Sequence, residues 1–142
     1  MARKSSVKRP APMHPGRYIA LRRKAAGLTR RRVADLLNGS PANADSFLLR
    51  LKHLEETGEY NGDANALIYA LASLLRIDRA IVRQLAARVE DPDNPDLPVP
   101  QICRDCGCTF SRACIDVTGQ PCHWVEPDRC SACVPLAERS AA

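Results

Sequence analysis

The sequence predicts an all-α domain of about five short helices, followed by a small cysteine-rich module. Two observations lead to this prediction. Apolar residues recur at helical spacing through residues 15–90, with few signals for strands. All seven cysteines then lie between residues 103 and 133, behind a segment at 91–100 that holds four prolines and three aspartates. Because proline cannot continue a helix, we expect this segment to be an extended linker.

The remaining segments complete the predicted organisation. We expect a disordered basic arm at residues 1–14 and a disordered tail at 136–142, on either side of a helical domain (15–90) and a cysteine-rich module (101–135). The chain has no apolar run of membrane-spanning length, and its start has no apolar core of a secretion signal. We therefore expect a cytoplasmic protein whose thiols stay reduced.

Turn and capping residues predict the helix boundaries. The first helix should have Pro15 near its first turn and end at Gly27. The last helix should bury Ile81, Val82, Leu85 and Val89. The later helices are expected to begin at small polar capping residues, which are Thr29 for the second, Asp45 or Ser46 for the third, Asp63 for the fourth and Asp78 for the fifth.

The basic residues are unevenly distributed along the chain. Residues 1–34 contain eleven lysines and arginines and no acidic residue, whereas the remainder has a net charge of −6. A cationic end favours an acidic polymer as partner, most simply nucleic acid. The alternative is a solvated basic segment that aids solubility.

The helical part resembles a known family of DNA-binding domains. The stretch "YIALRRKAAGLTRRRVADLL" is similar to the first two helices of the lambda-repressor-like (XRE) helix-turn-helix family, with Gly27, Leu28 and Thr29 at the step between them. The stretch "HLEETG" is similar to the end of the third helix of that family. The resemblance covers residues 16–88, and "NGSPANAD" adds length before the third helix.

The resemblance implies a transcriptional regulator that binds double-stranded DNA, with an associated location on the nucleoid of a bacterial host. Many such proteins are homodimers, although the sequence shows no dimer interface. The third helix would present Asn43, Ser46, Arg50 and His53 to the bases. The residues expected to contact phosphates are Arg22, Arg23, Lys24, Arg30, Arg31 and Arg32, with Arg3, Lys4, Lys8 and Arg9 of the arm.

A second class of function also fits the sequence. The alternative is a protein-interaction adaptor, in which the helices no longer read bases and the cysteine-rich module docks a protein partner. An enzyme is not expected, because the sequence shows no acid/base pair, phosphate-binding glycine loop or nucleophile with its base.

The outer cysteines have the spacing of a metal site. Cys103 and Cys106 form one Cys-x-x-Cys pair, and Cys130 and Cys133 form a second pair after 23 intervening residues. Such a pair delivers two thiolates to one tetrahedral metal ion. The four thiols predict a structural zinc site, and the arrangement resembles a zinc ribbon or treble-clef finger. Gly107 follows the first pair, where a positive φ would turn backbone N–H groups toward sulfur.

The inner cysteines leave several interpretations open. Cys108, Cys114 and Cys122 with His123 could form a second zinc site, or the thiolates could be shared between metals. An iron–sulfur cluster is a further alternative, and so is a role as small buried hydrophobic residues. The stretch "PCHWVEPDRCSAC" is similar to cysteine-rich tails of small phage and prophage proteins, which implies a phage or prophage origin.

Overall fold

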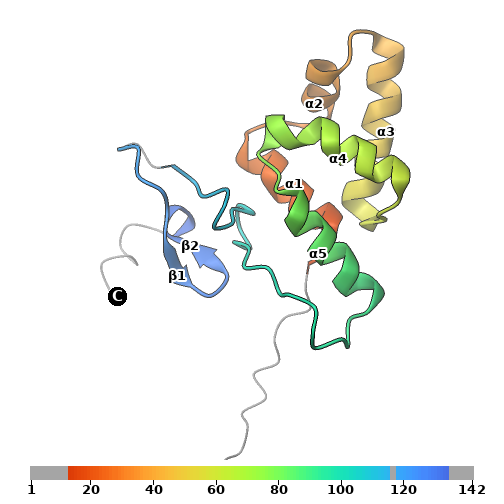
Figure 1. Ribbon diagram of the computed structural model, residues 1–142. Helices are drawn as coiled ribbons and strands as arrows, with labels where there is room; N and C mark the ends of the chain where they lie inside the picture. The colour runs from red at the N-terminus through yellow and green to blue at the C-terminus, as the bar shows by residue number, and fades with distance from the viewer. Residues whose placement is uncertain (1–12, 116–117, 135–142) are drawn as a thin grey trace, which may run out of the picture.

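The computed structural model describes residues 13–115 and 118–134, and this part of the chain is mostly helical (Figure 1). The five predicted helices are present, and the cysteine-rich region follows them as a short hairpin and turns. The elements are α1 (Pro15–Ala25), α2 (Arg30–Leu37), α3 (Pro41–Thr57), α4 (Gly62–Leu75), α5 (Arg79–Glu90), β1 (Trp124–Glu126), β2 (Arg129–Cys130) and the 3-10 helix η1 (Ser131–Cys133).

Two terminal predictions fall largely outside the described residues. They are the basic arm, of which only Met13 and His14 are described, and the tail at 136–142. Within the described ranges, no helix combines the length and the apolar character needed to cross a bilayer.

Local capping explains where most helices begin. The Thr29 hydroxyl caps α2 by accepting a hydrogen bond from the Arg32 N–H at 3.1 Å. The Asp78 carboxylate caps α5 by accepting from the Ala80 N–H at 2.9 Å. Both caps were predicted from the sequence. The fourth helix begins slightly earlier than predicted, because Asn61 rather than Asp63 caps it.

The start of α3 differs more from the prediction. The helix begins at Pro41, where Ser40 caps it by accepting from the Asn43 N–H at 3.3 Å, and not at Asp45 or Ser46. Proline suits the first helical turn, since its missing N–H would have no partner there. Residues 41–45 of the extra stretch "NGSPANAD" are therefore helical. They lengthen α3 at its N-terminal end.

The helices share one apolar core. Tyr18, Ile19, Val33, Leu51 and Leu71 are completely buried in it. In this core α1 packs against α3, α4 and α5, while α2 packs against α3. The prediction for α5 was wrong at one position, because Val89 is 52% exposed near the end of that helix.

A buried ion pair joins α1 to α3. The Arg23 guanidinium donates two hydrogen bonds of 2.8 Å to the Glu55 carboxylate, whose side chain is 1% exposed. Arg30 of α2 donates a third bond to Glu55 at 3.1 Å. The three contacts fix α1, α2 and α3 relative to one another and satisfy a carboxylate that water does not reach.

The segment at 91–100 is not helical, but it is not extended over its whole length. Turns occupy most of residues 91–97, where the Asn94 N–H bonds to the Asp91 carbonyl at 3.3 Å. Arg88 of α5 donates to the Leu97 carbonyl at 3.2 Å, which holds this segment against the helix.

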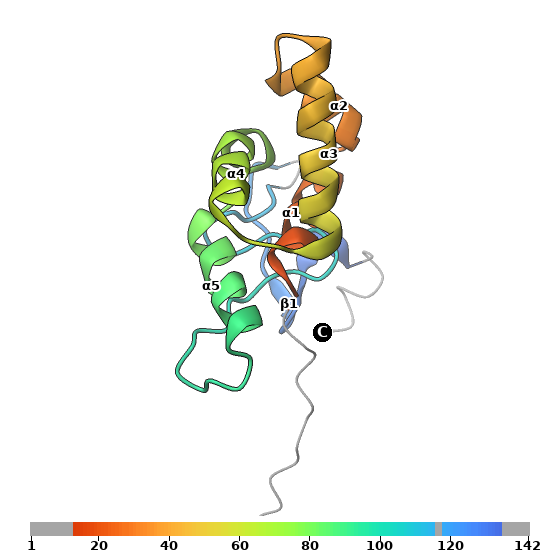
Figure 2. The same ribbon diagram turned by 90° about the vertical axis from the view of Figure 1, so that its right-hand side faces the viewer.

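The cysteine-rich region lies against α1 and against the corner between α4 and α5 (Figures 1 and 2). Ile102, which is 6% exposed, belongs to the helical core. Arg22 of α1 donates to the Leu75 carbonyl at 3.2 Å and to the Cys106 carbonyl at 3.1 Å. Ser111 also donates to the Asp78 carboxylate. The region is therefore docked on the helices and not merely tethered to them.

We expect Arg23→Met to destabilise the helical domain by about 3–5 kcal/mol, because it leaves a buried carboxylate without its main partner. Urea unfolding followed by circular dichroism measures this loss. The double variant Arg23→Met with Glu55→Leu should recover part of the lost stability, because it also removes the stranded charge. An unchanged midpoint in the single variant would show that the pair does not hold α1 to α3.

Candidate metal centre

Backbone turns bring the first Cys-x-x-Cys pair together. The Gly107 N–H bonds to the Cys103 carbonyl at 2.9 Å, and the Cys103 N–H bonds to the Cys108 carbonyl at 3.0 Å. Gly107 has the positive φ that its place after Cys106 predicted, at +73°. A Cβ on Gly107 would lie 3.0 Å from Leu21, so the glycine also lets this turn approach α1 closely.

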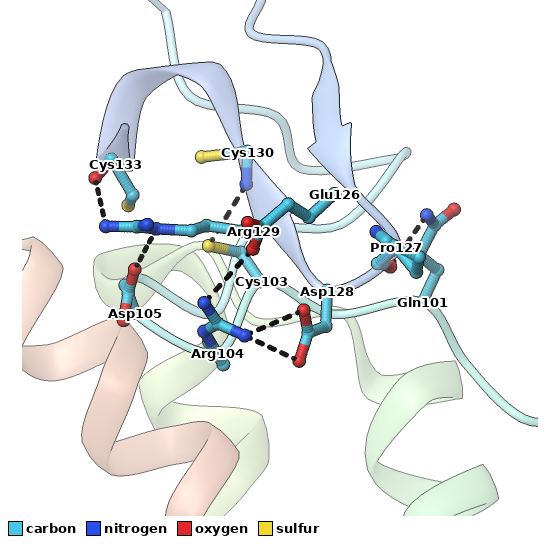
Figure 3. Close-up of polar contacts among 10 residues, drawn as sticks. All are labelled: Gln101, Cys103, Arg104, Asp105, Glu126, Pro127, Asp128, Arg129, Cys130 and Cys133. Atoms are coloured by element: carbon cyan, nitrogen blue, oxygen red, sulfur yellow. Dashed lines mark hydrogen bonds and ion pairs between the residues drawn. The ribbon is translucent and has the colours of Figure 1, made fainter. Parts of the chain in front are cut away.

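The second pair is positioned by the hairpin of β1 and β2, which are antiparallel. Cys130 ends β2, and Cys133 ends η1 directly after it. The Cys130 N–H points at the Cys103 sulfur, 3.4 Å away, and Figure 3 shows these two residues facing each other. The hairpin therefore places the second pair against the first.

All seven cysteines have free thiols, and their sulfur atoms converge. Cys106 Sγ lies 3.5 Å from Cys114 Sγ and 3.7 Å from Cys130 Sγ. Cys108 Sγ lies 3.8 Å from Cys122 Sγ. The edge of a tetrahedral zinc–thiolate site is about 3.8 Å, given Zn–S bonds of ~2.3 Å. The sulfurs are thus spaced as ligands of a tetrahedral metal ion.

The grouping of the sulfurs differs from the predicted one. Within each of two sets, all sulfurs lie within 4.8 Å of one another. The two sets are Cys103, Cys106, Cys108 and Cys130, and Cys108, Cys114, Cys122 and Cys130. A third group places Cys133 with Cys103 and the carboxylate of Asp105. His123 is exposed and belongs to none of these groups, so Cys130 takes the place that the sequence suggested for His123.

The sulfurs strongly perturb one another's protonation. The Cys108 thiol donates to the Cys106 sulfur, which lowers the pKa of Cys106 and raises the pKa of Cys108. Burial raises the pKa of Cys103, Cys114 and Cys133, and the charge on Cys106 raises them further. The geometry therefore favours a thiolate at Cys106 and disfavours thiolates at Cys103, Cys108, Cys114 and Cys133 unless a cation is present. A bound divalent cation would reverse this preference, since it stabilises several thiolates at once.

Charged side chains lie beside Cys103, Cys130 and Cys133 (Figure 3). Arg104 forms ion pairs with Glu126 at 3.1 Å and Asp128 at 3.2 Å. Arg129 pairs with Asp105 at 2.9 Å and donates to the Cys133 carbonyl at 3.2 Å. These contacts tie the first cysteine turn to the hairpin, and they orient the two segments that carry the Cys-x-x-Cys pairs.

Two of the predicted phosphate contacts lie in the interior. Arg22 is 6% exposed and Arg23 is 8% exposed, and their guanidinium groups bond within the chain as described above. Neither group faces the surface, so the prediction that they contact DNA is corrected. The sequence could not reveal this, because the partners Glu55 and Cys106 lie far along the chain.

The other predicted DNA-contact residues are more accessible. Arg30 is partly exposed and pairs with Glu55 and Glu56, while Arg31 pairs with Asp35 and Asp45. The exposed residues of the predicted set are Lys24, Arg31, Arg32, Asn43, Ser46, Arg50 and His53. Asn43, Ser46 and Arg50 lie on one face of α3, as their spacing requires.

A second basic surface was not predicted. Arg76, Arg79, Arg83 and Arg112 line a depression of about 590 Å³ around the corner of α4 and α5. Arg79 and Arg83 are four residues apart in α5, so the sequence alone indicates that they lie on the same face of the helix. Arg112 comes from the cysteine-rich region, which no local pattern could place here.

Comparisons with models of protein families, with curated proteins and with solved structures found no match for this chain.

We expect a strong chelator to release the metal and unfold the cysteine-rich region. Trp124, the chain's only tryptophan, packs against the thiols, so its emission should shift to longer wavelength. Helical circular dichroism should persist, but with a lower unfolding midpoint. Ile102 and Arg22 would lose contacts worth about 1.5–3 kcal/mol each.

The control is the same chelator already saturated with zinc, which should change neither signal. Cys106→Ser should reproduce the effect of chelation. An unchanged Trp124 emission wavelength after chelation and in Cys106→Ser would show that the fold of this region does not depend on a metal bound by the thiols.

Proposed function

We propose that this protein is a DNA-binding transcriptional regulator of the XRE type, with a structural zinc module at its C-terminal end. In this proposal α2 and α3 form the helix-turn-helix unit, and α3 enters the major groove. The observation that carries the proposal is the exposed polar face of α3, where Asn43, Ser46 and Arg50 lie in one row beside the basic α2.

The chemistry of this row suits base recognition. The arginine fork can donate two hydrogen bonds to guanine, and an asparagine can bond bidentately to adenine. Arg50 donates to the Asp63 carbonyl at 3.2 Å, an exposed bond that a base edge could replace. In both views α2 and the N-terminal end of α3 lie away from the cysteine-rich region (Figures 1 and 2).

Phosphate contacts come from a smaller set than the sequence suggested. Lys24, Arg31 and Arg32 are exposed near the ends of α1 and α2, while Arg22 and Arg23 serve the interior. The N-terminus of α2 adds a partial positive charge close to Arg31 and Arg32. Together these positive charges favour electrostatic binding to DNA, and the affinity should fall as salt is added.

The remaining parts of the proposal concern the module and its setting. The paired thiols favour zinc in a ribbon-like or treble-clef-like module, and reduced thiols fit the cytoplasm or nucleoid of a bacterial host. The resemblance of its cysteine-rich end supports a phage or prophage origin.

One observation favours the alternative of a protein-interaction adaptor. Phe110 of the cysteine-rich region is 94% exposed, and Ile115 is 56% exposed. Large apolar side chains so open to water are typical of contact surfaces when they gather in a patch. The adaptor would use this region and would not read bases.

Selection of bound sequences from random duplex DNA tests the regulator proposal. The wild type should enrich a defined site. Arg50→Ala should lose about 1–3 kcal/mol of discrimination at one or two positions of that site.

Arg32→Ala is the matched control, because it removes the same charge from α2. It should weaken binding to all sequences. It should also reduce the steepness of the plot of log binding constant against log salt concentration by about one. Enrichment of no site, with Arg50→Ala and Arg32→Ala behaving alike, would favour the adaptor or a non-specific binder.

A further inference from the structure

Seven thiols present a problem of number for tetrahedral metal sites. One zinc ion takes four ligands, which leaves three cysteines unused, and two separate zinc ions need eight ligands. The chain has seven cysteines, and the one histidine in their midst belongs to no ligand group. Two ions can nevertheless both be four-coordinate if they share a single thiolate.

We propose that the seven cysteines bind two divalent thiophilic metal ions of the zinc type in one cluster, and that Cys130 Sγ bridges the two ions. The bridge gives each ion four sulfur ligands and uses every thiol of the chain. The proposal deepens the zinc part of the proposed function and does not depend on DNA binding.

The first ion would lie between the two Cys-x-x-Cys pairs. Cys106 Sγ is 3.7 Å from Cys130 Sγ, which matches one edge of a tetrahedron. Cys133 Sγ lies within 4.8 Å of Cys103 Sγ. Cys103, Cys106 and Cys130 thus lie within 4.8 Å of one another, and Cys133, which lies beside Cys103, would complete the ligand set of the first ion.

The second ion would lie among the inner cysteines. Cys108, Cys114 and Cys122 lie within 4.8 Å of one another and of Cys130. The 3.8 Å separation of Cys108 and Cys122 again has the length of a tetrahedral edge. No other residue among those described completes this set, since His123 points to solvent and is not within reach.

Cys130 is the sulfur that both positions share. Cys130 belongs to the first ion because a Cys-x-x-Cys pair, here with Cys133, binds a single metal ion. It belongs to the second ion because its sulfur lies within 4.8 Å of the sulfurs of all three inner cysteines. Cys108 also belongs to both four-sulfur sets, but a bridge there would divide the Cys130/Cys133 pair between the two ions. Cys130 is 1% exposed at the end of β2, in the centre of the cluster.

The surroundings offset the charge of such a cluster. Two divalent ions with seven thiolates carry a net charge of −3. Backbone N–H groups of Cys108 and Cys130 donate to the sulfurs of Cys106 and Cys103, at 3.4 Å each. The guanidinium groups of Arg22 and Arg129 bond to the carbonyls of Cys106 and Cys133. Such donors and cations stabilise a negative metal–thiolate centre.

Native mass spectrometry of the full chain with zinc gives the stoichiometry, and we expect two ions per chain. Cadmium NMR on the cadmium-loaded wild type tests whether one sulfur bridges the two ions. An NMR-active isotope at both positions should give two resonances that are coupled through the shared sulfur. This measurement needs no variant, so it does not depend on whether a cysteine substitution folds.

Three variants locate the ions. Cys122→Ser should reduce the stoichiometry to one ion, whereas His123→Ala, its neighbour, should keep two ions and the coupling. Cys130→Ser should weaken both sites and abolish the coupling. Loss of an ion in His123→Ala would overturn the assignment of the second site.

The outcomes separate this proposal from the one before it. A chain that binds no metal refutes both the zinc module and the cluster. One ion at saturation refutes the two-ion cluster, and two ions without coupling refute the shared thiolate. Both results leave the structural zinc module in place. A coloured, iron-containing protein with inorganic sulfide would refute the zinc-type cluster in favour of an iron–sulfur centre.

Discussion

The interior of the cysteine-rich region is made of sulfur, and the rest of that region depends on this. Its buried cluster consists of Cys103, Cys108 and Cys130, with the other cysteines and Trp124 packed around them. A core of this size buries too little apolar surface to hold a chain whose described residues form only a two-stranded hairpin, isolated bridges and one short 3-10 helix. Bringing thiols within 3.5–3.8 Å also opposes the ionisation of more than one of them unless a cation lies among them. A bound metal ion would hold the region together and would stabilise several thiolates at once.

The helical domain and the cysteine-rich region are joined by one side chain in particular. Arg22 is buried between them and bonds to the end of α4 on one side and to Cys106 on the other. A buried guanidinium is stable only while its donors are satisfied, so each part supplies partners that the other needs. Ile102 adds apolar contact across the same boundary. The two regions consequently form a single structural unit, although their interiors differ completely in chemistry.

Local signals predicted more of the fold than of the site. Thr29 and Asp78 were found from the sequence because a cap involves residues only two or three apart. The start of α3 was misplaced, since Ser40 and Asp45 are both good caps and burial of Ala44 favours the longer helix. Spacing identified the two outer cysteine pairs as one candidate site. It could not show that Cys130 approaches the inner thiols, which depends on how the hairpin folds back over residues 103–122.

A continuous set of contacts runs from the thiols to the face proposed to meet DNA. Cys106 bonds through its carbonyl to Arg22, and the next residue, Arg23, holds Glu55 of α3. Glu55 also accepts from Arg30 of α2, so one carboxylate sets the angle between the two helices of the proposed helix-turn-helix unit. Arg22 and Arg23 belong to a basic run, and for this reason the sequence predicts that they contact phosphates. Their burial gives them a different role, which is to orient α2 and α3 and leave the exposed Lys24, Arg31 and Arg32 to face an anionic partner.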